Sequence, residues 1–380
     1  MPETAAADAP WTGRRVVLVH DWLTGMRGGE KVLESLCRIF PDADLLTLVH
    51  VRGSVSPLIE RRRVRTSIIQ RLPGAGRWYR HYLPLFPAAI EGFDLDDVDF
   101  VVSTSHCAAK SVVATGRARH LCYCHSPMRY AWDQFDHYFG PDRVGRAGSA
   151  LLRPVLANLA RWDRATAPRV TRFVANSRHV AGRIGRYYNR EASVLHPPVD
   201  TGFFTPSAAD PEPYFLVVSA LVPYKRIDVA IDAARSAGVP LRVVGSGPDL
   251  ARLRARAGTS AEFLGNLDND ALRAQYRAAR ALVLPAVEDF GIAPVEAMAC
   301  GRPVIALGEG GATETVVPGV TGWLVAEQTA PAFAAAMRLA AVASVDPHAI
   351  AAHAAAFSTP RFESAFRRIA AETLTAPIAC

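Results

Sequence analysis

The sequence predicts an α/β protein built from two doubly wound domains that face each other across a cleft. Both halves of the chain alternate short apolar runs with amphipathic segments, which is the order of a parallel sheet covered by helices. The length of 380 residues is enough for two hydrophobic cores. A proline pair at 197–198 and the polar stretch at 207–213 indicate a linker between the halves.

The chain divides by composition into four segments. We predict a disordered tail over residues 1–13, an N-terminal domain over 14–205, a second domain over 206–358 and a helical C-terminal segment over 359–380. No apolar run reaches the roughly 18 uncharged residues of a membrane-spanning helix. The start also lacks the basic stretch and long apolar core of a signal peptide. We therefore expect a cytoplasmic protein whose scattered cysteines are reduced and buried.

Positive charge is concentrated in the first half of the chain. Residues 1–205 contain 28 Lys and Arg against 19 Asp and Glu, a balance of +9, whereas the remainder has a balance of −2. A basic half indicates an anionic partner, either a nucleic acid or a lipid surface. Because no RNA-binding motif accompanies the charge, we predict no nucleic-acid partner.

Residues 61–86 combine seven arginines with the large apolar side chains of Trp78, Tyr79, Tyr82, Leu83, Leu85 and Phe86. Arginine stems and aromatic rings suit the interface of an anionic membrane, which would place the protein at the inner face of the cell membrane. The alternative is a solvated helical hairpin whose aromatic residues belong to the core. The sequence alone favours neither interpretation.

The N-terminal domain opens with a buried strand over 16–19, a glycine turn and an amphipathic helix. Gly28 and Gly29 precede this helix, whose apolar positions recur with the helical period. The dinucleotide fingerprint G-x-G-x-x-G is absent. The two glycines therefore either shape the turn or bring their N–H groups to a phosphate across the cleft.

His125 begins the loop after a strand that ends at Cys124. A histidine at a strand tip is a hydrogen-bonding group near pH 7, although a capped surface histidine is the simpler interpretation. The acids at 94–99 form D-x-D pairs, but they precede a strand, whereas open α/β sheets bind ligands at the carboxyl ends of strands. We therefore predict no metal site.

In the second domain, Lys225 and Arg226 follow the apolar strand that begins at residue 214. Cations at that end of a strand neutralise a diphosphate and stabilise it as a leaving group. Gly245 and Gly247 follow the next strand and predict a turn there.

Residues 281–306 carry the strongest functional pattern: a buried strand, a loop and a helix that begins near Ile292. The unpaired N–H groups of a helix N-terminus attract phosphate, and Gly291 lets a ligand approach the backbone closely. Glu288 in the loop and Glu296 in the helix are placed to accept hydrogen bonds from the hydroxyls of one ligand. The simpler interpretation is a solvated loop acid and a favourable charge in a first turn.

The string E-D-F-G-I-A-P-V-E followed by A-M-A-C-G-R-P-V-I-A resembles the E-x7-E signature of retaining glycosyltransferases of family 4, which have the GT-B fold. The resemblance implies that Glu288 contacts the transferred sugar and that Glu296 holds the ribose of the nucleotide. It implies that the backbone N–H groups of Phe290, Gly291 and Ile292 meet the sugar and the diphosphate. It also implies a last helix that crosses back to the first domain.

Two further strings, H-D-W-L-x-G-x-R-G-G-E-K-V-L-E and C-H-S-P-x-R-Y-x-W-D, resemble a bacterial subgroup of that family, the mannosyltransferases of surface-polysaccharide assembly. This resemblance makes Gly28 and Gly29 cleft residues of the donor site. It puts His125 beside the sugar, with its backbone carbonyl near the positive charge that develops during transfer. The residues that it assigns to the acceptor side are Arg129, Tyr130, Trp132 and Asp133.

The family pattern of G-R-L, a few residues and then lysine is only partly present, because Ala220 occupies the arginine position. Lys225 matches the lysine, and Arg226 is the candidate substitute for the missing cation. The resemblance also places Gly245 next to the nucleotide and Leu267 beside its base.

Together these patterns predict a retaining glycosyltransferase that moves a hexose, mannose from GDP-mannose, to a lipid-linked saccharide. The resemblance implies a same-face mechanism without metal or cofactor, in which the leaving phosphate helps to take the acceptor proton. His125, Lys225 and Glu288 are its predicted catalytic residues. Three alternatives remain open: a UDP-sugar donor, a sugar-nucleotide epimerase or hydrolase, and a catalytically inactive nucleotide-sugar-binding protein, which Ala220 favours.

Overall fold

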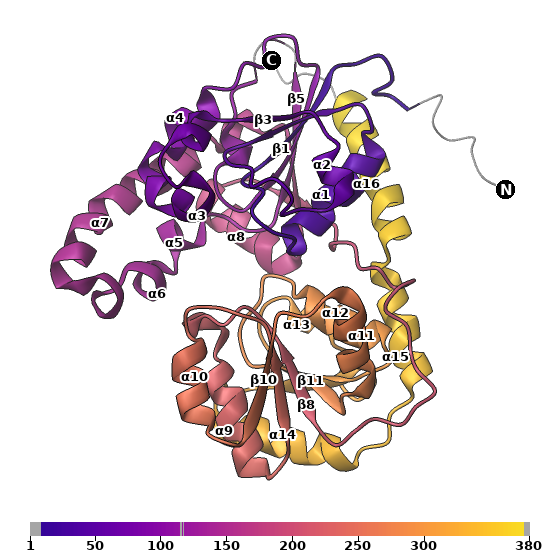
Figure 1. Cartoon of the computed structure of the whole chain (residues 1–380). Helices are drawn as coiled ribbons and strands as arrows, with labels where there is room; N and C mark the ends of the chain where they lie inside the picture. Colours follow the sequence, from indigo (N-terminus) through magenta and orange to yellow (C-terminus); the bar gives the residue numbers. More distant parts are fainter. Residues whose placement is uncertain (1–8, 115, 117, 376–380) are drawn as a thin grey trace. The chain divides into compact units, whose positions relative to one another are not determined.

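The computed structural model describes residues 9–114, 116 and 118–375, and the chain falls into two compact units. The first unit comprises the chain up to Pro198 together with the residues from Phe362 onward, and the second comprises Val199–Arg361 (Figure 1). Each unit holds one parallel sheet with a hydrophobic core on either face. The predicted α/β class and the two doubly wound domains are therefore confirmed.

The boundary between the units falls after Pro198 and not after residue 205. Val199 and Phe204 are buried in the core of the second unit, and the N–H of Val199 donates to the carbonyl of Phe357 at 2.9 Å. The segment after the proline pair is therefore the first packed part of the second unit. The last helix, α16 (Thr359–Thr375), begins in the second unit and belongs to the first from Phe362 onward.

The sheet of the first unit has the order β3-β2-β1-β4-β5-β6-β7, and its paired strands are all parallel. Its strands are β1 (Val16–His20), β2 (Asp44–Thr47), β3 (Val64–Thr66), β4 (Phe100–Ser105), β5 (Arg119–Cys124), β6 (Arg172–Ala175) and β7 (Ala192–Val194). The chain runs from β1 out to β3 and returns to β4 on the other side of β1. The strand order therefore reverses between β1 and β4, and open α/β sheets bind ligands outside the carboxyl ends of their strands at such a point.

The helices that cover this sheet are α1 (Gly28–Ile39), α2 (Pro57–Glu60), α3 (Ala75–Trp78), α4 (Phe86–Glu91), α5 (Arg129–Trp132), α6 (Phe135–Phe139), α7 (Pro141–Ala165), α8 (Arg178–Tyr188) and most of α16. On one face, Leu18 of β1 and Leu33 of α1 share a core with Phe366 of α16. On the other face, Val19 of β1 shares a core with Phe86 of α4. Both faces of β1 are therefore buried, as its apolar sequence predicts.

The predicted disordered tail is wrong for residues 9–13. These residues form a hydrogen-bonded turn, and the Trp11 ring packs against Phe40 with 4.9 Å between ring centroids. A partly buried tryptophan removes apolar area from water, which holds this short segment against the first unit. The rest of the predicted tail, residues 1–8, lies outside the described residues.

The sheet of the second unit has the order β10-β9-β8-β11-β12-β13 and is also parallel. Its strands are β8 (Phe215–Val218), β9 (Leu241–Val244), β10 (Ala261–Gly265), β11 (Ala281–Leu284), β12 (Val304–Leu307) and β13 (Gly322–Val325). Its helices are α9 (Ile227–Ala237), α10 (Leu250–Ala257), α11 (Asn269–Ala278), α12 (Ile292–Ala299), α13 (Ala312–Thr315), α14 (Ala330–Val342) and α15 (Pro347–Ala354). The strand order here reverses between β8 and β11. Within the described residues, no helix of either unit combines the length and the apolar character needed to cross a membrane.

Candidate functional site

Three histidines meet at the carboxyl ends of the central strands of the first unit. His20 is the last residue of β1, His106 follows β4 directly and His125 follows β5 directly. The ring centroids of His20 and His106 are 6.3 Å apart, and those of His106 and His125 are also 6.3 Å apart. This histidine cluster (His20, His106 and His125) lies where the strand order reverses, which is the expected position of a ligand site.

The N-terminus of α1 lies against two of these rings. Gly28 and Gly29 are the first two residues of the helix, and the N–H of the preceding residue, Arg27, donates to the carboxylate of Glu30 at 3.0 Å. A Cβ atom at Gly29 would lie 3.5 Å from Cε1 of His20 and 3.6 Å from Nε2 of His125. The structure therefore brings Gly29 and His125 together, and a longer side chain at this position would displace the rings.

His125 is held by hydrogen bonds on its backbone and on its ring. Its N–H donates to the carbonyl of Ser105 at 2.8 Å, and its own carbonyl accepts from Nδ2 of Asn176 at 3.0 Å. Burial, with His106 and His20 close by, lowers the pKa of His125 to about 3. The ring is therefore neutral at pH 7 and acts as a hydrogen-bonding group instead of a charge.

Asp21 and His106, which the sequence patterns did not indicate, form a carboxylate–imidazole pair. Oδ2 of the buried Asp21 lies 3.1 Å from Nδ1 of His106, and the carboxylate also accepts four backbone N–H bonds of 2.6–3.0 Å from residues 106–109. Burial lowers the pKa of His106 although Asp21 acts to raise it. Asp21 directly follows β1 and His106 directly follows β4. Because α/β sheets bind ligands at the carboxyl ends of their strands, these two positions in the sequence could have indicated the pair.

The residues predicted for the acceptor side come from α5 and its end, and all four make contacts within the first unit. The Tyr130 hydroxyl lies 2.6 Å from Sγ of Cys107, and burial raises its pKa well above that of an ordinary tyrosine. The carboxylate of Asp133 pairs with Arg183 at 2.9 Å. Arg129 lies beside them, with Nε 3.4 Å from the hydroxyl of Ser126.

Trp132 belongs to a buried polar network. Its Nε1–H donates to Oδ2 of Asp163 at 2.7 Å, and its ring stacks on Tyr187 with 4.7 Å between centroids. Asp163 is fully buried and forms an ion pair with the equally buried Lys110, with 2.9 Å between Nζ and Oδ1. The hydroxyl of Tyr188 also donates to Asp163 at 2.9 Å. These contacts give Trp132 a structural role that its motif did not reveal.

The predicted strand, loop and helix of residues 281–306 are present in the second unit as β11, a loop and α12. Glu288 lies in the loop, and Gly291 precedes α12 with a φ of 88°, a left-handed value that favours glycine. A Cβ atom at Gly291 would lie 3.3 Å from Cγ of Pro294, inside the first turn of the helix. The start of α12 therefore requires a glycine, as the sequence pattern predicts.

Lys225 and Glu288 come together at the carboxyl end of the second sheet. Lys225 lies in η5 (Pro223–Lys225), just after β8, and its ammonium contacts the carboxylate of Glu288, which follows the neighbouring strand β11. Both side chains are largely buried. The structure thus joins two of the three predicted catalytic residues at one point, beside the N-terminus of α12.

Arg226 is held in place beside Lys225. It adopts a φ of 51°, and its guanidinium donates to Oε1 of Gln328 at 2.7 Å and lies 3.4 Å from Oδ1 of Asp228. Gln328 is anchored in turn to the carbonyl of Pro285 at 2.9 Å. Ala220, which follows β8, is exposed. Its side chain cannot supply the cation that the arginine of the family pattern would provide at this position.

The side chains of Glu296 and Phe290 are both buried in the second unit. Glu296 is 4% exposed, and the hydroxyl of the buried Tyr276 donates to its Oε2 at 2.9 Å. The Phe290 ring belongs to the core, 5.8 Å from the ring of Phe357. Leu267 and Ile292 are half-buried against the same core.

Gly245 and Gly247 form the tight turn predicted after β9. A Cβ atom at Gly245 would lie 1.9 Å from the carbonyl oxygen of Ser219, and one at Gly247 would lie 2.3 Å from that of Leu221. The loops after β8 and β9 are therefore packed backbone to backbone, which only glycine permits. This close approach explains both glycines without a ligand.

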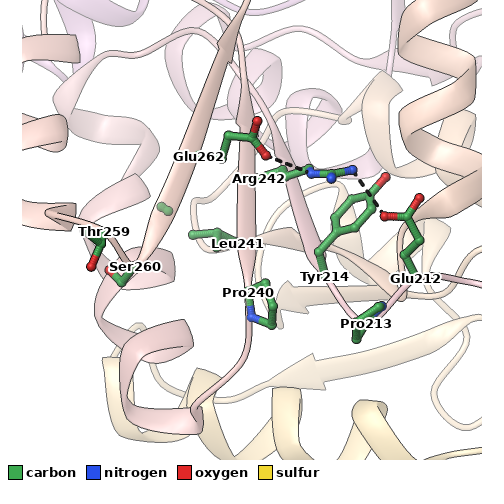
Figure 2. Close-up of a pocket in the computed structure, with 10 residues that line it drawn as sticks. Glu212, Pro213, Tyr214, Pro240, Leu241, Arg242, Thr259, Ser260 and Glu262 are labelled. Atoms are coloured by element: carbon green, nitrogen blue, oxygen red, sulfur yellow. Dashed lines mark hydrogen bonds and ion pairs between the residues drawn. The ribbon is translucent and has the colours of Figure 1, made fainter.

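A shallow hollow of about 320 Å³ lies at the opposite, amino ends of β8, β9 and β10 (Figure 2). Arg242 crosses it, 3.0 Å from the carboxylate of Glu262 and 3.6 Å from that of Glu212, with its guanidinium 4.0 Å from the centre of the Tyr214 ring. None of the predicted site residues lines this hollow. Within the described chain, no group of three or more His, Cys, Asp and Glu side chains is arranged to hold a metal ion.

The structure divides the apolar side chains of the basic segment (residues 61–86) into two sets. Tyr79, Leu83 and Phe86 are buried in the core of the first unit. Trp78 and Leu85 are 52% and 44% exposed, and Ile68, in η1 (Ile68–Arg71), is 59% exposed. The helical-core interpretation therefore holds for the first set, whereas the members of the second set are exposed. A hollow of about 230 Å³ lies between Trp78, His81 and Tyr82.

Two family models match the chain, one over each half. Residues 26–203 match the model described as Glycosyltransferase Family 4, and residues 200–351 match the model described as Glycosyl transferases group 1. The D-inositol 3-phosphate glycosyltransferase of Mycolicibacterium paratuberculosis is 36% identical over 213 residues, which are 48% of this chain and 48% of that protein. Its namesake from Mycolicibacterium smegmatis is 34% identical over 179 residues, 40% of this chain and 41% of that one. The chain spans about half the length of the curated relatives it matches.

Solved structures share the fold at low sequence identity. Sucrose-phosphate synthase from Thermosynechococcus elongatus superposes with a TM-score of 0.68 at 18% identity, over 94% of this chain and 98% of that chain. HepE from Anabaena, solved with UDP-glucose, superposes with a TM-score of 0.64 at 20% identity, over 95% and 99%. The two family models together run from residue 26 to residue 351, and each falls almost wholly on one of the two units. The chain therefore belongs to the GT-B glycosyltransferases of the group 1 and family 4 type.

Proposed function

We propose that this chain is a retaining glycosyltransferase that transfers mannose from GDP-mannose to a lipid-linked saccharide. The observation that carries the proposal is the contact of Lys225 with Glu288 beside the first turn of α12. A nucleotide sugar needs a cation for its diphosphate, an acceptor for its sugar hydroxyls and further N–H donors for its phosphate oxygens. These three groups occur together at this end of the second sheet. Family membership supports glycosyl transfer as the reaction. The two N-terminal sequence strings that resemble bacterial mannosyltransferases support mannose as the transferred sugar.

In the proposed reaction, the bond between the anomeric carbon and the diphosphate oxygen breaks. A bond from the acceptor oxygen to that carbon forms on the same face, and the acceptor proton passes to the leaving diphosphate. Lys225, Arg226 and the amides at the start of α12 stabilise the charge that collects on the diphosphate, in place of a metal ion. Glu288 accepts hydrogen bonds from the sugar and so orients it.

His125, in the first unit, is the third predicted catalytic residue. Its neutral ring is a hydrogen-bond partner for a sugar hydroxyl, and its carbonyl, fixed by Asn176, carries a partial negative charge suited to the positive charge that develops on the sugar. Gly28 and Gly29 are the predicted cleft residues of the donor site, and a Cβ atom at Gly29 would lie 3.6 Å from Nε2 of His125.

A UDP-sugar donor is the second candidate. The structurally similar protein HepE was solved in complex with UDP-glucose, so this fold includes a protein that binds a uridine diphosphate sugar. The curated relatives are named for an inositol phosphate acceptor instead of a polysaccharide. Both the base of the donor and the acceptor therefore need direct measurement.

Thermal unfolding with GDP, UDP, GDP-mannose, UDP-glucose and UDP-N-acetylglucosamine tests the donor. A ligand at 100 times its dissociation constant adds about 2.7 kcal/mol of stability. We expect stabilisation by GDP and GDP-mannose alone, followed by turnover of GDP-mannose on a lipid-linked saccharide that persists in EDTA. Stabilisation by a UDP compound alone would replace mannose by another sugar. Hydrolysis or epimerisation without acceptor would replace transfer, and binding without any turnover would indicate an inactive sugar-nucleotide-binding protein.

We also propose that the basic segment docks on an anionic bilayer, where a lipid-linked acceptor resides. Between Arg61 and Ile90 the sequence has seven arginines and no acid. Arg77 and Arg80 are exposed on the same short helices that expose Trp78 and Leu85. Arginine attracts anionic headgroups while exposed tryptophan and leucine enter the interface, so this combination favours a membrane over an aqueous partner.

A further inference from the structure

Arg226 adopts a backbone conformation that arginine rarely takes. Its φ of 51° and ψ of 38° lie in the left-handed region. Among the described residues, the other non-glycine residue with a positive φ is Asn189, and asparagine is a residue type that visits this region. Glycine would adopt the same backbone without steric cost, so position 226 carries a long side chain although it strains the main chain. Such strain points to a role for the arginine side chain itself.

The guanidinium of Arg226 is held by Gln328, about a hundred positions later in the chain. Arg226 directly precedes α9 and Gln328 lies just before α14, and the two helices share a core through Val229 and Phe333. Nη1 of Arg226 donates to Oε1 of Gln328 at 2.7 Å, and Nε2 of Gln328 donates to the carbonyl of Pro285 at 2.9 Å. Gln328 therefore bridges the start of α9 and the end of β11.

The orientation of the Gln328 amide follows from its two partners. A guanidinium has only donors and a carbonyl oxygen only accepts, so the amide oxygen faces Arg226 and the amide nitrogen faces Pro285. The reversed amide would set donor against donor and acceptor against acceptor. Pro285 directly follows β11 and begins the loop that also carries Glu288. The bridge therefore fixes the Arg226 guanidinium to that loop.

Nη2 of Arg226 remains available to a ligand. Nε lies 3.4 Å from Oδ1 of Asp228 and Nη1 faces Gln328, and no group in the described part of the chain is hydrogen-bonded to Nη2. The side chain is 37% exposed. It follows β8, whose neighbour β11 marks the reversal of strand order, where open α/β sheets bind ligands. A planar guanidinium with free N–H groups at such a point suits a phosphate group.

We propose that Gln328 is a positioning residue, which holds the Arg226 guanidinium for the diphosphate of the bound nucleotide sugar in place of the arginine that is absent at Ala220. Arg226 meets the ligand, and Gln328 acts only through Arg226. This inference rests on the proposed function, because the diphosphate belongs to the proposed donor. The simpler alternative is a contact that only holds the start of α9 in place, and the two roles predict different results for nucleotide binding.

Calorimetric titration of the full chain with GDP and with UDP tests Arg226. Arg226→Ala and Arg226→Gly should each weaken binding of the nucleotide about tenfold, the effect of losing one charge-assisted contact. The glycine variant should have the higher urea midpoint of the two, because glycine relaxes a left-handed backbone that alanine strains. Equal losses of affinity in two variants of unequal stability would separate the ligand contact from the fold. A midpoint of the alanine variant at or above that of the glycine variant would contradict the strain.

Gln328→Leu tests the positioning role, because leucine fills similar space but makes neither hydrogen bond. It should weaken nucleotide binding about fivefold in the wild-type background. It should have no further effect when residue 226 is already alanine, since Gln328 acts through the guanidinium. Arg338→Ala is the matched control: this exposed arginine of α14 bonds the carbonyl of Ser236 near the other end of α9, and its loss should leave nucleotide binding unchanged.

Two results would overturn the inference while the proposed donor site stands. One is wild-type nucleotide affinity in Arg226→Ala together with a loss in Lys225→Ala, which would leave the diphosphate to Lys225. The other is an equal effect of Gln328→Leu with and without the Arg226 side chain, which would give Gln328 a purely structural role. If the wild-type protein binds neither GDP nor UDP, the proposed function itself fails, and the assigned ligand of Arg226 fails with it.

Discussion

Lys225 and Glu288 lie 63 positions apart in the sequence, yet their side chains form an ion pair at the carboxyl end of the second sheet. The pair exists because β8 and β11 are neighbours in the sheet although two strands separate them along the chain. In the ligand-free protein each group neutralises the other. In the proposed reaction, the diphosphate and the sugar hydroxyls of the donor would give each of these groups a new partner.

Removing either member of this pair should abolish most of the activity. We expect Lys225→Ala and Glu288→Ala each to lower turnover at least about a hundredfold, the effect typical of losing a group that stabilises transition-state charge. The measurement is initial-rate kinetics at saturating donor. Glu262→Ala, which removes an exposed acid that pairs with Arg242 at the other end of the sheet, is the control. Wild-type turnover in both active-site variants would contradict the assignment of the site.

Restoring the missing arginine should strengthen donor binding. Ala220 is exposed just after β8, so an arginine fits there without disturbing the core. A charge-assisted contact of about 1.4 kcal/mol to a diphosphate would lower the dissociation constant about tenfold in Ala220→Arg. Titration with the nucleoside diphosphate measures it, with Ala209→Arg as a control for added charge at an exposed position. Equal effects of the two variants would argue against a diphosphate near Ala220.

The buried ion pair of Lys110 and Asp163 should be essential for the stability of the first unit. Lys110→Ala leaves a carboxylate in the interior without its cation, and such a loss costs about 3–5 kcal/mol. Urea unfolding provides the measurement. Arg153→Ala breaks an exposed pair with Asp136 and should cost less than about 1 kcal/mol. Similar losses in the two variants would mean that the buried pair is screened by water.

Stability should fall in mild acid because of His120. This ring is 1% exposed and contacts Ser103 through Nε2 at 2.7 Å, and burial lowers its pKa to about 3. Below about pH 6.5 the unfolded chain binds a proton that the folded chain does not, so stability is full above that pH and is lost as the pH falls toward 3. Urea midpoints at pH 7.5, 6 and 5 measure the slope. The slope should become shallower in His120→Gln, with the remainder due to His125, whose pKa burial also lowers to about 3, and it should be unchanged in His137→Gln, which changes an exposed histidine.

The basic segment should bind anionic vesicles and not neutral ones. Each arginine near such a surface contributes about 1 kcal/mol, so Arg77→Gln combined with Arg80→Gln should weaken binding more than tenfold. Trp78→Ser should weaken it through lost apolar contact. Co-sedimentation with phosphatidylglycerol vesicles provides the measurement, and Leu339→Ser, an exposed apolar residue of the second unit, provides the control. Equal binding to phosphatidylcholine vesicles would contradict the charge argument.

The local sequence was sufficient to predict those helices and strands whose boundaries are set by their own residues. The apolar run of β11, Pro285 directly after it and Gly291 at the start of α12 define that segment without help from the rest of the chain. The ion pair of Lys225 and Glu288 was not predictable in the same way. It depends on which strands are neighbours, and strand order is a property of the whole sheet.

The same reason explains the residues that were missed or assigned differently. Asp21 and His106 meet because β1 pairs with β4. Tyr130, Trp132 and Asp133 have the composition of a sugar-binding surface, but a sequence does not show which way a ring or a carboxylate points. Their polar atoms bind the side chains of the first unit.

The course of α16 has a consequence for how the protein is made. Phe366 and its neighbours on this helix complete the core that contains Leu18 and Leu33, at the beginning of the first unit. The ribosome synthesises the whole of Val199–Arg361 between these two contributions. The first unit therefore cannot complete this core until α16 has left the ribosome. The second unit is synthesised as one uninterrupted segment, so all the residues of its core are available earlier than those of the first unit.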